Sequence, residues 1–277
     1  MGPEGPYEPP EDALLLLNPG AKRLVLNRRG STVWEVTTDH GPYAVKVGYP
    51  SRTHAWTALA PAREAAILRQ LTHERILSGE WERGTWSAQP WRRGDSLYDL
   101  WEPHRLGADS PVPNLDEALS CAVALAALHG KGWVHGDVQP AHFIIGRTAG
   151  TFLIDLALAQ GGRVPRGCDF PYRGCLVHYE APEISASVLE SGTATATQEA
   201  DVYALGAALF ISATGWRHVG YPDDAPREIQ RQAIVTGPHR PVTVPGVLGS
   251  LIPHMLSRSP VDRPTSAEVC QTLSAAL

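Results

Sequence analysis

Residues 134–145 read Val-His-Gly-Asp-Val-Gln-Pro-Ala-His-Phe-Ile-Ile. Four side chains able to exchange protons or donate hydrogen bonds, including Asp137 and His142, stand here among apolar residues. A carboxylate in such surroundings is costly unless it has partners or a task. The stretch is therefore the first candidate for chemistry, and the motifs on either side of it decide which chemistry is meant.

Four further motifs accompany this stretch in a fixed order. Tyr-Ala-Val-Lys (43–46) and Arg-Glu-Ala-Ala-Ile-Leu (63–68) precede it, while Leu-Ile-Asp-Leu-Ala (153–157) and Ala-Pro-Glu (181–183) follow it. Together they resemble the motifs of the eukaryotic-like (Hanks-type) protein kinases, from the lysine strand to the end of the activation segment. The resemblance covers residues 21–277 and implies a bilobal kinase fold of the α/β (α+β) class.

The resemblance also predicts the domain organisation. Residues 1–12 are rich in Pro, Gly and Glu and are expected to form a disordered tail. Residues 13–90 are expected to form the small lobe, a β-sheet plus one helix. Residues 91–277 are expected to form a mainly helical large lobe. No internal repeat and no linker to another domain is visible in the sequence.

The composition excludes several classes of function. A formal net charge of −5 offers no broad basic field for nucleic acid. The longest apolar run, 202–213, is too short to span a bilayer, and the first residues do not form a signal peptide. The four cysteines show no CxxC pair, which favours reduced thiols and a cytoplasmic protein. They are Cys121, Cys168, Cys175 and Cys270.

Two charged residues in the first part of the chain have the spacing of an ion pair. Glu64 stands eighteen residues after Lys46, and the resemblance implies that its carboxylate presents the ammonium to the α- and β-phosphates of ATP. Alone, each would be an ordinary surface residue, but the accompanying motifs favour the functional interpretation. The predicted phosphate lid, 27–32, keeps only Gly30, so its backbone should grip phosphate less tightly.

The Gln-Pro-Trp-Arg sequence that ends at Arg92 resembles the hinge to which adenine binds. With Gln89 as the gatekeeper, Pro90 supplies a carbonyl acceptor and Arg92 supplies a backbone N–H. The resemblance adds Ala44 and Ile144 to the cofactor-binding residues. ATP with Mg²⁺ is therefore the implied cofactor.

The resemblance assigns the catalytic residues one by one. Asp137 is the expected base, Asp155 the magnesium ligand, and Gln139 stands where a lysine usually contacts the γ-phosphate. His142 replaces the asparagine that usually supplies a second metal ligand. Because magnesium prefers oxygen, an imidazole ligand favours a single metal or Mn²⁺. Alternatively, His142 hydrogen-bonds the loop and touches no metal, which is slightly favoured.

Several supporting elements are predicted in the large lobe. Asn114 caps a helix over 115–129 that Gly130 ends. A second capping box is predicted at Thr265 and Glu268, before the last helix. The buried stripe of the 115–129 helix is predicted to contain Leu115, Leu119, Val123 and Ala126.

Two long-range contacts are implied by the resemblance. Asp201 follows a predicted capping box at 195–198. It should accept hydrogen bonds from backbone N–H groups of residues 134–145, which correspond to the catalytic loop of the kinases that the sequence resembles. Arg263, in Asp-Arg-Pro, should pair with Glu183. Both contacts would tie the ends of the large lobe to the loop that carries Asp137.

The usual phosphorylation switch is missing from the sequence. Between Asp155 and Glu183 there is no Ser or Thr, only Tyr172 and Tyr179, and Gly136 replaces the arginine that would bind a phosphate. The segment is therefore expected to be held without phosphorylation. Tyr179 is expected to be buried.

Three functions remain open from the sequence. The favoured one is an ATP-dependent kinase for Ser/Thr hydroxyls of a protein or peptide, including a ribosomal natural-product (lanthipeptide-type) precursor handled with a partner enzyme. The second is a pseudokinase that binds or scaffolds such a partner, which the lost glycines and asparagine favour. The third is a small-molecule kinase, because the His-Gly-Asp form resembles the aminoglycoside and choline kinases.

Overall fold

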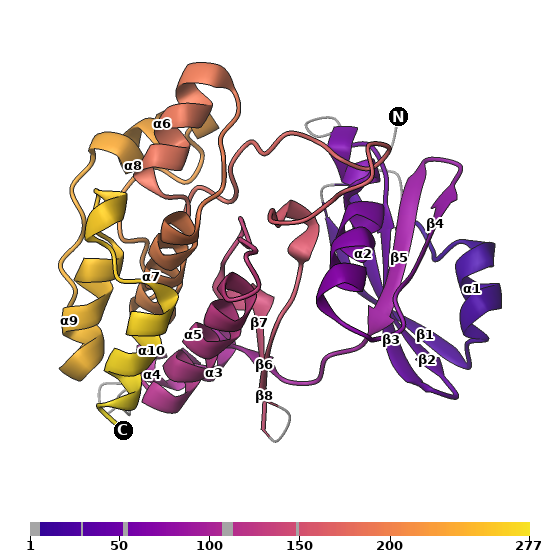
Figure 1. Cartoon of the computed structure of the whole chain (residues 1–277), viewed down its shortest axis with the longest axis horizontal. Coiled ribbons are helices and arrows are strands. Elements are labelled where there is room, and N and C mark those ends of the chain that lie inside the picture. Colours follow the sequence, from indigo (N-terminus) through magenta and orange to yellow (C-terminus); the bar gives the residue numbers. More distant parts are fainter. Residues whose placement is uncertain (1–5, 29, 52–54, 107–112, 148–149) are drawn as a thin grey trace. The chain divides into compact units, whose positions relative to one another are not determined.

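The computed structural model describes residues 6–28, 30–51, 55–106, 113–147 and 150–277. The chain divides into two compact units (Figure 1). Unit 1 runs to Arg92 and also contains Gly162–Phe170, while unit 2 contains Arg93–Gly161 and Pro171–Leu277. An antiparallel sheet in unit 1 and a set of helices in unit 2 give the predicted α+β class.

Unit 1 is built on a five-stranded antiparallel sheet of order β1-β2-β3-β5-β4. Alternation along β3 buries Val45 and Val47 on one face and turns Lys46 to the other. Helix α1 packs on the Val45 face, and α2 supplies the partner of Lys46 on the opposite face (Figure 1). The elements are α1 Glu11–Leu17, β1 Ala21–Arg28, β2 Ser31–Thr38, β3 Gly41–Gly48, α2 Ala60–Leu71, β4 Leu77–Trp81 and β5 Gly84–Pro90.

The predicted tail is too long at its C-terminal end. Residues 1–5 lie outside the described residues, but the carbonyl of Tyr7 accepts hydrogen bonds from Thr32 and from the Trp34 indole. The Tyr7 ring packs on Tyr49 at 4.6 Å between centroids. This part of the tail is ordered because its aromatic side chain and backbone find partners on the sheet.

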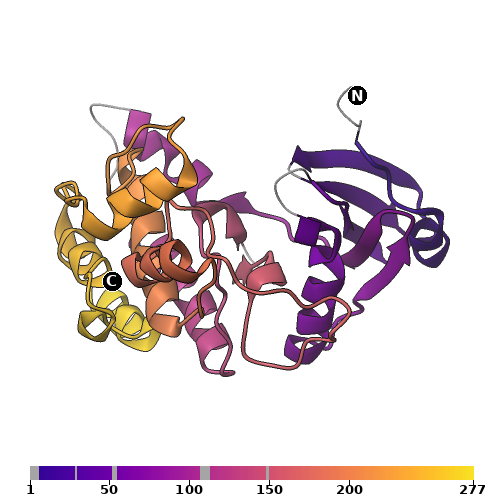
Figure 2. The same ribbon diagram turned by 90° about the horizontal axis from the view of Figure 1, so that it is seen from above.

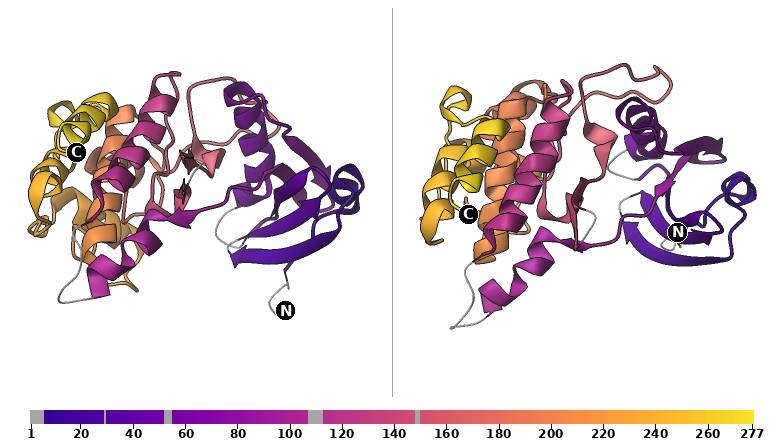
Figure 3. Two further views of the ribbon diagram at one scale, coloured as in Figure 1. Left: turned by 90° about the horizontal axis from the view of Figure 1, so that it is seen from below. Right: turned by 60° about the horizontal axis from the view of Figure 1, so that its bottom comes forward.

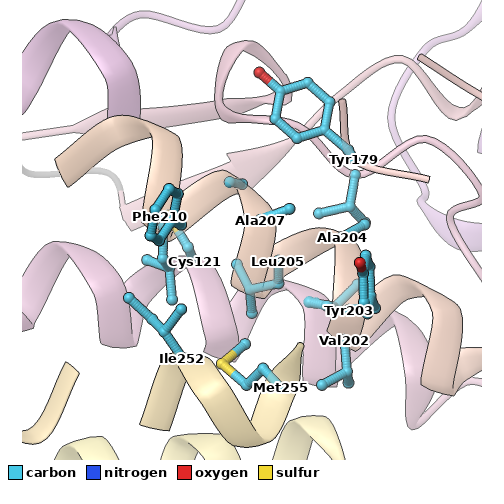
Figure 4. Close-up of a cluster of buried hydrophobic side chains, with 14 of the residues drawn as sticks. Cys121, Tyr179, Val202, Tyr203, Ala204, Leu205, Ala207, Phe210, Ile252 and Met255 are labelled. Carbon is cyan, nitrogen blue, oxygen red and sulfur yellow. The ribbon is translucent and has the colours of Figure 1, made fainter. Parts of the chain in front are cut away.

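Unit 2 is mainly helical, and α7 lies at the centre of its core. Buried side chains of α7 meet residues of α5 and α9, among them Leu205, Cys121 and Met255 (Figure 4). A small sheet of order β6-β7-β8 carries the end of the catalytic loop. The elements are β6 Asp95–Ser96, α3 Leu97–Leu100, α4 Glu102–Leu106, α5 Leu115–His129, β7 Phe143–Gly146, β8 Gly150–Leu153, α6 Pro182–Ser191, α7 Gln198–Thr214, α8 Arg227–Thr236, α9 Gly246–Met255 and α10 Ser266–Ser274.

The helix ends are mostly as predicted, with one correction. Asn114 caps α5, and a capping box joins Thr265 to Glu268 at α10. The predicted box at 195–198 is wrong, because Thr197 caps α7 by accepting from the Ala200 N–H.

The predicted buried stripe of α5 is only partly right. Leu115 and Leu119 are half-buried against the core, but Val123 is 51 % exposed. Leucine and alanine occur on every side of α5, so the periodicity could not single out one face. The buried residues are Ala118, Cys121, Ala122, Leu125, Leu128 and His129.

Among the described residues, no helix is long and apolar enough to cross a bilayer. All four cysteines lie in this part of the chain as free thiols, as the sequence predicted.

Candidate active site

The predicted ion pair is present in unit 1. Lys46 Nζ lies 2.7 Å from one carboxylate oxygen of Glu64 and 2.9 Å from the other. The two side chains are 12 % and 2 % exposed, so the pair is shielded from water and each charge depends on the other. The central strand β3 and helix α2 hold the ammonium in one place.

The predicted phosphate lid is shorter than expected. Arg28 pairs with Ser31, so two residues join β1 to β2, and Arg29 lies outside the described residues. Gly30 has φ of +85°, and a Cβ there would lie 2.6 Å from the Tyr49 carbonyl oxygen. The glycine is thus required by close packing inside unit 1, whatever it contributes to phosphate binding.

The predicted hinge residues lie at the end of β5. Ala44 on β3 pairs with Gln89, and Pro90 is the last residue of β5. The Arg92 guanidinium is paired with Glu74, which leaves its assigned role to the backbone. The remaining cofactor-binding candidate, Ile144, belongs to unit 2 and lies on β7.

Helix α2 is fastened by Gly162–Phe170, which follows the Asp155 motif in the chain (Figures 2 and 3). Arg63 Nε donates to Asp169 at 3.2 Å, and its guanidinium lies 5.1 Å from the centre of the Phe170 ring. Gln70 hydrogen-bonds both the N–H and the C=O of one residue of this segment. Since Glu64 lies next to Arg63, these contacts also support the Lys46 pair.

In unit 2, Asp201 of α7 holds the backbone of the catalytic loop, as predicted. Its Oδ2 accepts the His135 N–H at 2.6 Å, and its Oδ1 accepts the Gly136 N–H at 2.9 Å. The ring of His129 adds a third contact to Oδ2 at 3.1 Å. A buried carboxylate surrounded by donors in this way fixes the conformation of the residues just before Asp137.

His135 links the catalytic loop to the segment that carries Asp155. Its Nδ1 accepts the Asp137 N–H at 3.2 Å, and its Nε2 lies 3.0 Å from the Ile154 carbonyl oxygen. The carbonyl can only accept, so Nε2 carries the proton. Burial lowers the pKa of His135 to about 4, which keeps the ring neutral. The two aspartates are therefore positioned together.

Asp137 combines an ionised carboxylate with an unused acceptor. Burial raises its pKa to about 6, with Asp155 adding to the rise and His142 opposing it. Its Oδ2 accepts the Gln139 amide at 3.3 Å. The Leu176 backbone N–H also lowers this pKa, but Oδ1 is buried and makes no well-formed hydrogen bond to the residues described. A buried oxygen of this kind is ready to receive a hydroxyl proton.

His142 touches both aspartates of the site. Its Nδ1 donates to the Asp137 carbonyl at 2.8 Å, and its Nε2 lies 3.3 Å from Asp155 Oδ2 and 3.1 Å from the Gln139 amide nitrogen. Burial opposes protonation, but the hydrogen bond to Asp155 and the two carboxylates outweigh it and raise the pKa of His142 to about 8. At neutral pH, the ring is a cation that neutralises Asp155.

The sequence is similar to known kinases. It is 31 % identical over 187 residues to the serine/threonine-protein kinase PkaA of Streptomyces coelicolor, covering 64 % of this chain and 32 % of PkaA. It is 30 % identical over 165 residues to the serine/threonine-protein kinase PknJ of Mycobacterium tuberculosis, covering 55 % of this chain and 26 % of PknJ. The mitosis inhibitor protein kinase wee1 of Schizosaccharomyces pombe is 26 % identical over 244 residues, or 76 % of this chain and 27 % of wee1.

These similarities to serine/threonine protein kinases, together with the order of the motifs, support the Hanks-type protein kinase family for this chain. The chain spans about a quarter to a third of the length of these curated kinases. No model of a protein family matches the sequence.

The second contact implied by the kinase motifs is also present. Arg263 donates from both terminal nitrogens to Glu183, each at 2.7 Å. Such a two-pronged pair fixes the end of the activation segment on the helical core. Tyr179, four residues earlier, is buried as predicted.

Other contacts in this chain were not found from the sequence. Glu180 forms a buried pair with Arg231 of α8 at 2.7 Å, and Tyr172 hydrogen-bonds the Gly136 carbonyl at 2.8 Å. The contact of Arg63 with Asp169 was missed in the same way. The sequence could have indicated a partner for Glu180, because a charged residue next to Ala-Pro-Glu needs one. For Tyr172, the sequence gave no indication of its contact beyond its position between Asp155 and Glu183.

Proposed function

We propose that this chain is an ATP-dependent phosphotransferase that phosphorylates Ser or Thr hydroxyls of a protein or peptide. The observation that carries the proposal is Asp137: an ionised, fixed carboxylate with one buried oxygen that makes no well-formed hydrogen bond to the described residues. A purely structural aspartate would have used that oxygen. The names of the related kinases, PkaA and PknJ, support the acceptor class.

In this proposal, unit 1 binds the nucleotide. Lys46, held by Glu64, contacts the α- and β-phosphates. The Pro90 carbonyl and the Arg92 N–H receive the adenine edge, with Ala44 beside them. Gly30 contributes through the tight turn of the lid. Ile144 and the catalytic loop belong to unit 2.

The residues present fit a divalent ion that is bound largely by ATP and water. Among the described residues, no group of three or more His, Cys, Asp or Glu side chains is arranged to hold a metal. Mg²⁺ commonly takes only one or two carboxylates together with phosphate oxygens. We assign Asp155 as its ligand. The bound ion would neutralise charge on the phosphates.

His142 has two possible roles toward that ion. As a ligand it must first lose its proton and its contact with Asp155, which favours Mn²⁺ over Mg²⁺. As a positioning residue it keeps the hydrogen bond to the Asp137 carbonyl and supplies a positive charge itself. The bond already present favours the second role.

The residues of the chain then have separate tasks in the transfer. Asp137 Oδ1 accepts the hydrogen bond of the acceptor hydroxyl and holds its proton as the oxygen attacks. Gln139 restrains the other oxygen of Asp137 and donates toward the transferred phosphate without adding charge. His135 and Asp201 keep the loop in place throughout.

A more specific substrate can also be proposed. A small kinase with an edited catalytic loop suits a ribosomal natural-product (lanthipeptide-type) precursor, phosphorylated in the cytoplasm beside a partner enzyme that eliminates the phosphate. The supporting features are the altered lid and His142, which depart from general protein kinases.

A pseudokinase is the second candidate function. Two observations favour it: the two-residue lid, whose glycine is explained by packing, and the His142 ring that already neutralises Asp155. Such a protein would bind nucleotide or a partner enzyme without turnover.

The deciding experiment measures nucleotide binding and transfer together. The purified chain is mixed with ATP and either Mg²⁺ or Mn²⁺, and its melting temperature and phosphate transfer to Ser/Thr peptides, precursor peptides and small alcohols are recorded. Transfer to a peptide supports the proposal. A nucleotide-dependent rise in melting temperature with no transfer in either metal supports the pseudokinase, and transfer to small molecules alone supports a small-molecule kinase.

A further inference from the structure

Tyr172 joins the activation segment to the catalytic loop. Its hydroxyl donates a 2.8 Å hydrogen bond to the Gly136 carbonyl, and its side chain is buried. Its own backbone carbonyl accepts the Ala194 N–H at 3.0 Å, in the loop before α7. The residue is thus anchored at its backbone while its ring reaches the loop that carries Asp137.

The packing of the Tyr172 ring requires a residue without a side chain at position 136. Gly136 adopts φ of +75°, a conformation that residues with side chains rarely adopt. A Cβ there would lie 3.3 Å from Cε2 of Tyr172 and 3.0 Å from the Leu158 carbonyl oxygen. A longer side chain at 136 could not share this space with the Tyr172 ring.

The contact completes the hydrogen bonding of the residue next to Asp137. The Gly136 N–H is held by Asp201 at 2.9 Å, and its carbonyl is held by Tyr172. One restraint comes from the buried helix α7 and the other from the activation segment. Burial also raises the pKa of Tyr172 well above its usual value, so the hydroxyl stays a donor.

We propose that Tyr172 is a positioning residue for Asp137, and that its hydroxyl holds the catalytic loop in the conformation for phosphate transfer without any phosphorylated residue. The inference rests on the proposed function. It explains two features of the sequence together: the glycine at position 136, and the absence of Ser and Thr between Asp155 and Glu183.

The direct test is Tyr172→Phe, which keeps the ring and removes only the hydroxyl. We expect kcat to fall about tenfold, the factor that the loss of one hydrogen bond at the reacting loop corresponds to. The KM for ATP should stay unchanged, because Lys46 and Glu64 belong to the other unit. The matched control is Tyr203→Phe, which removes another hydroxyl of a buried tyrosine, one that is hydrogen-bonded to His218 at 2.7 Å. Its kcat should be normal.

A second variant tests the shape of position 136. Gly136→Ala should displace the Tyr172 ring and lower kcat. Adding Tyr172→Ala should then cost less than the product of the two single effects, because the ring that the new methyl group opposes is gone. Effects that simply multiply would show that the two residues act independently and would contradict the inference.

Amide hydrogen exchange over residues 134–139 gives a readout that needs no turnover. Faster exchange there in Tyr172→Phe, and not in Tyr203→Phe, supports the inference. An active wild type with unchanged kcat and unchanged exchange in Tyr172→Phe overturns the inference and leaves the proposed function intact. A wild type that transfers no phosphate overturns the proposed function and, with it, the catalytic part of the inference.

Discussion

Asp201→Asn should destabilise unit 2 and misplace the catalytic loop. The Asp201 side chain is 3 % exposed and receives the His135 and Gly136 N–H groups on different oxygens, with the His129 ring beside them. Asparagine offers one oxygen, and its amide group would face at least one of these donors. Each hydrogen bond to a buried charge contributes about 1.5–3 kcal/mol. We therefore expect unfolding of unit 2 to become easier by about 3 kcal/mol.

The assay is hydrogen exchange of α5 and α7 peptides at increasing urea, which reports the free energy of opening of unit 2 alone. The control is Asp223→Asn, whose side chain is 90 % exposed and pairs with Arg217 on the surface. Such a pair contributes at most about 1 kcal/mol. A loss in Asp201→Asn no larger than in Asp223→Asn would refute the argument that this carboxylate holds the loop.

Three further predictions concern pH, metal and phosphorylation. Burial lowers the pKa of His218 in the folded protein to about 3, whereas the pKa of an unfolded histidine is about 6.5. As the pH drops below about 6.5, the unfolded state binds a proton that the folded state does not, so the stability falls. From pH 7.5 to pH 5 the wild type should lose about 2 kcal/mol more of unfolding free energy than His218→Leu, and equal losses would contradict this. His142→Asn should lower the ratio of Mn²⁺-supported to Mg²⁺-supported turnover if His142 is a ligand, and should leave the ratio unchanged if the ring only positions Asp137. Phosphatase treatment should leave turnover unchanged, because residues 156–182 contain no Ser or Thr and both tyrosines there, Tyr172 and Tyr179, are buried. A marked loss of turnover would disprove this.

Contacts between charged residues could be predicted because the residues belong to motifs that resemble those of the Hanks-type kinases. Lys46 with Glu64, and Glu183 with Arg263, were each inferred as pairs and are paired. Asp201 was inferred to hold backbone N–H groups and does so. In each case the resemblance implied the partner, and the cost of an unpaired buried charge agrees with the contact that is found.

Contacts that depend on shape could not be predicted in this way. The face of α5 was partly misjudged because apolar residues surround the helix, and the lid was drawn too long because turn length depends on the pairing register of β1 with β2. The bond from Tyr172 to Gly136 depends on where a loop of irregular backbone returns to the core. No periodicity or spacing in the sequence encodes such a return.

The central claim, phosphate transfer from ATP by Asp137, is tested most directly by comparing three proteins. Wild type, Asp137→Asn and Lys46→Met are purified and each is given ATP, a divalent ion and the best peptide acceptor, and phosphopeptide formation is followed over time. The account predicts transfer by wild type and none above background in either variant, with both variants folded by circular dichroism. Undiminished transfer in Asp137→Asn would contradict it.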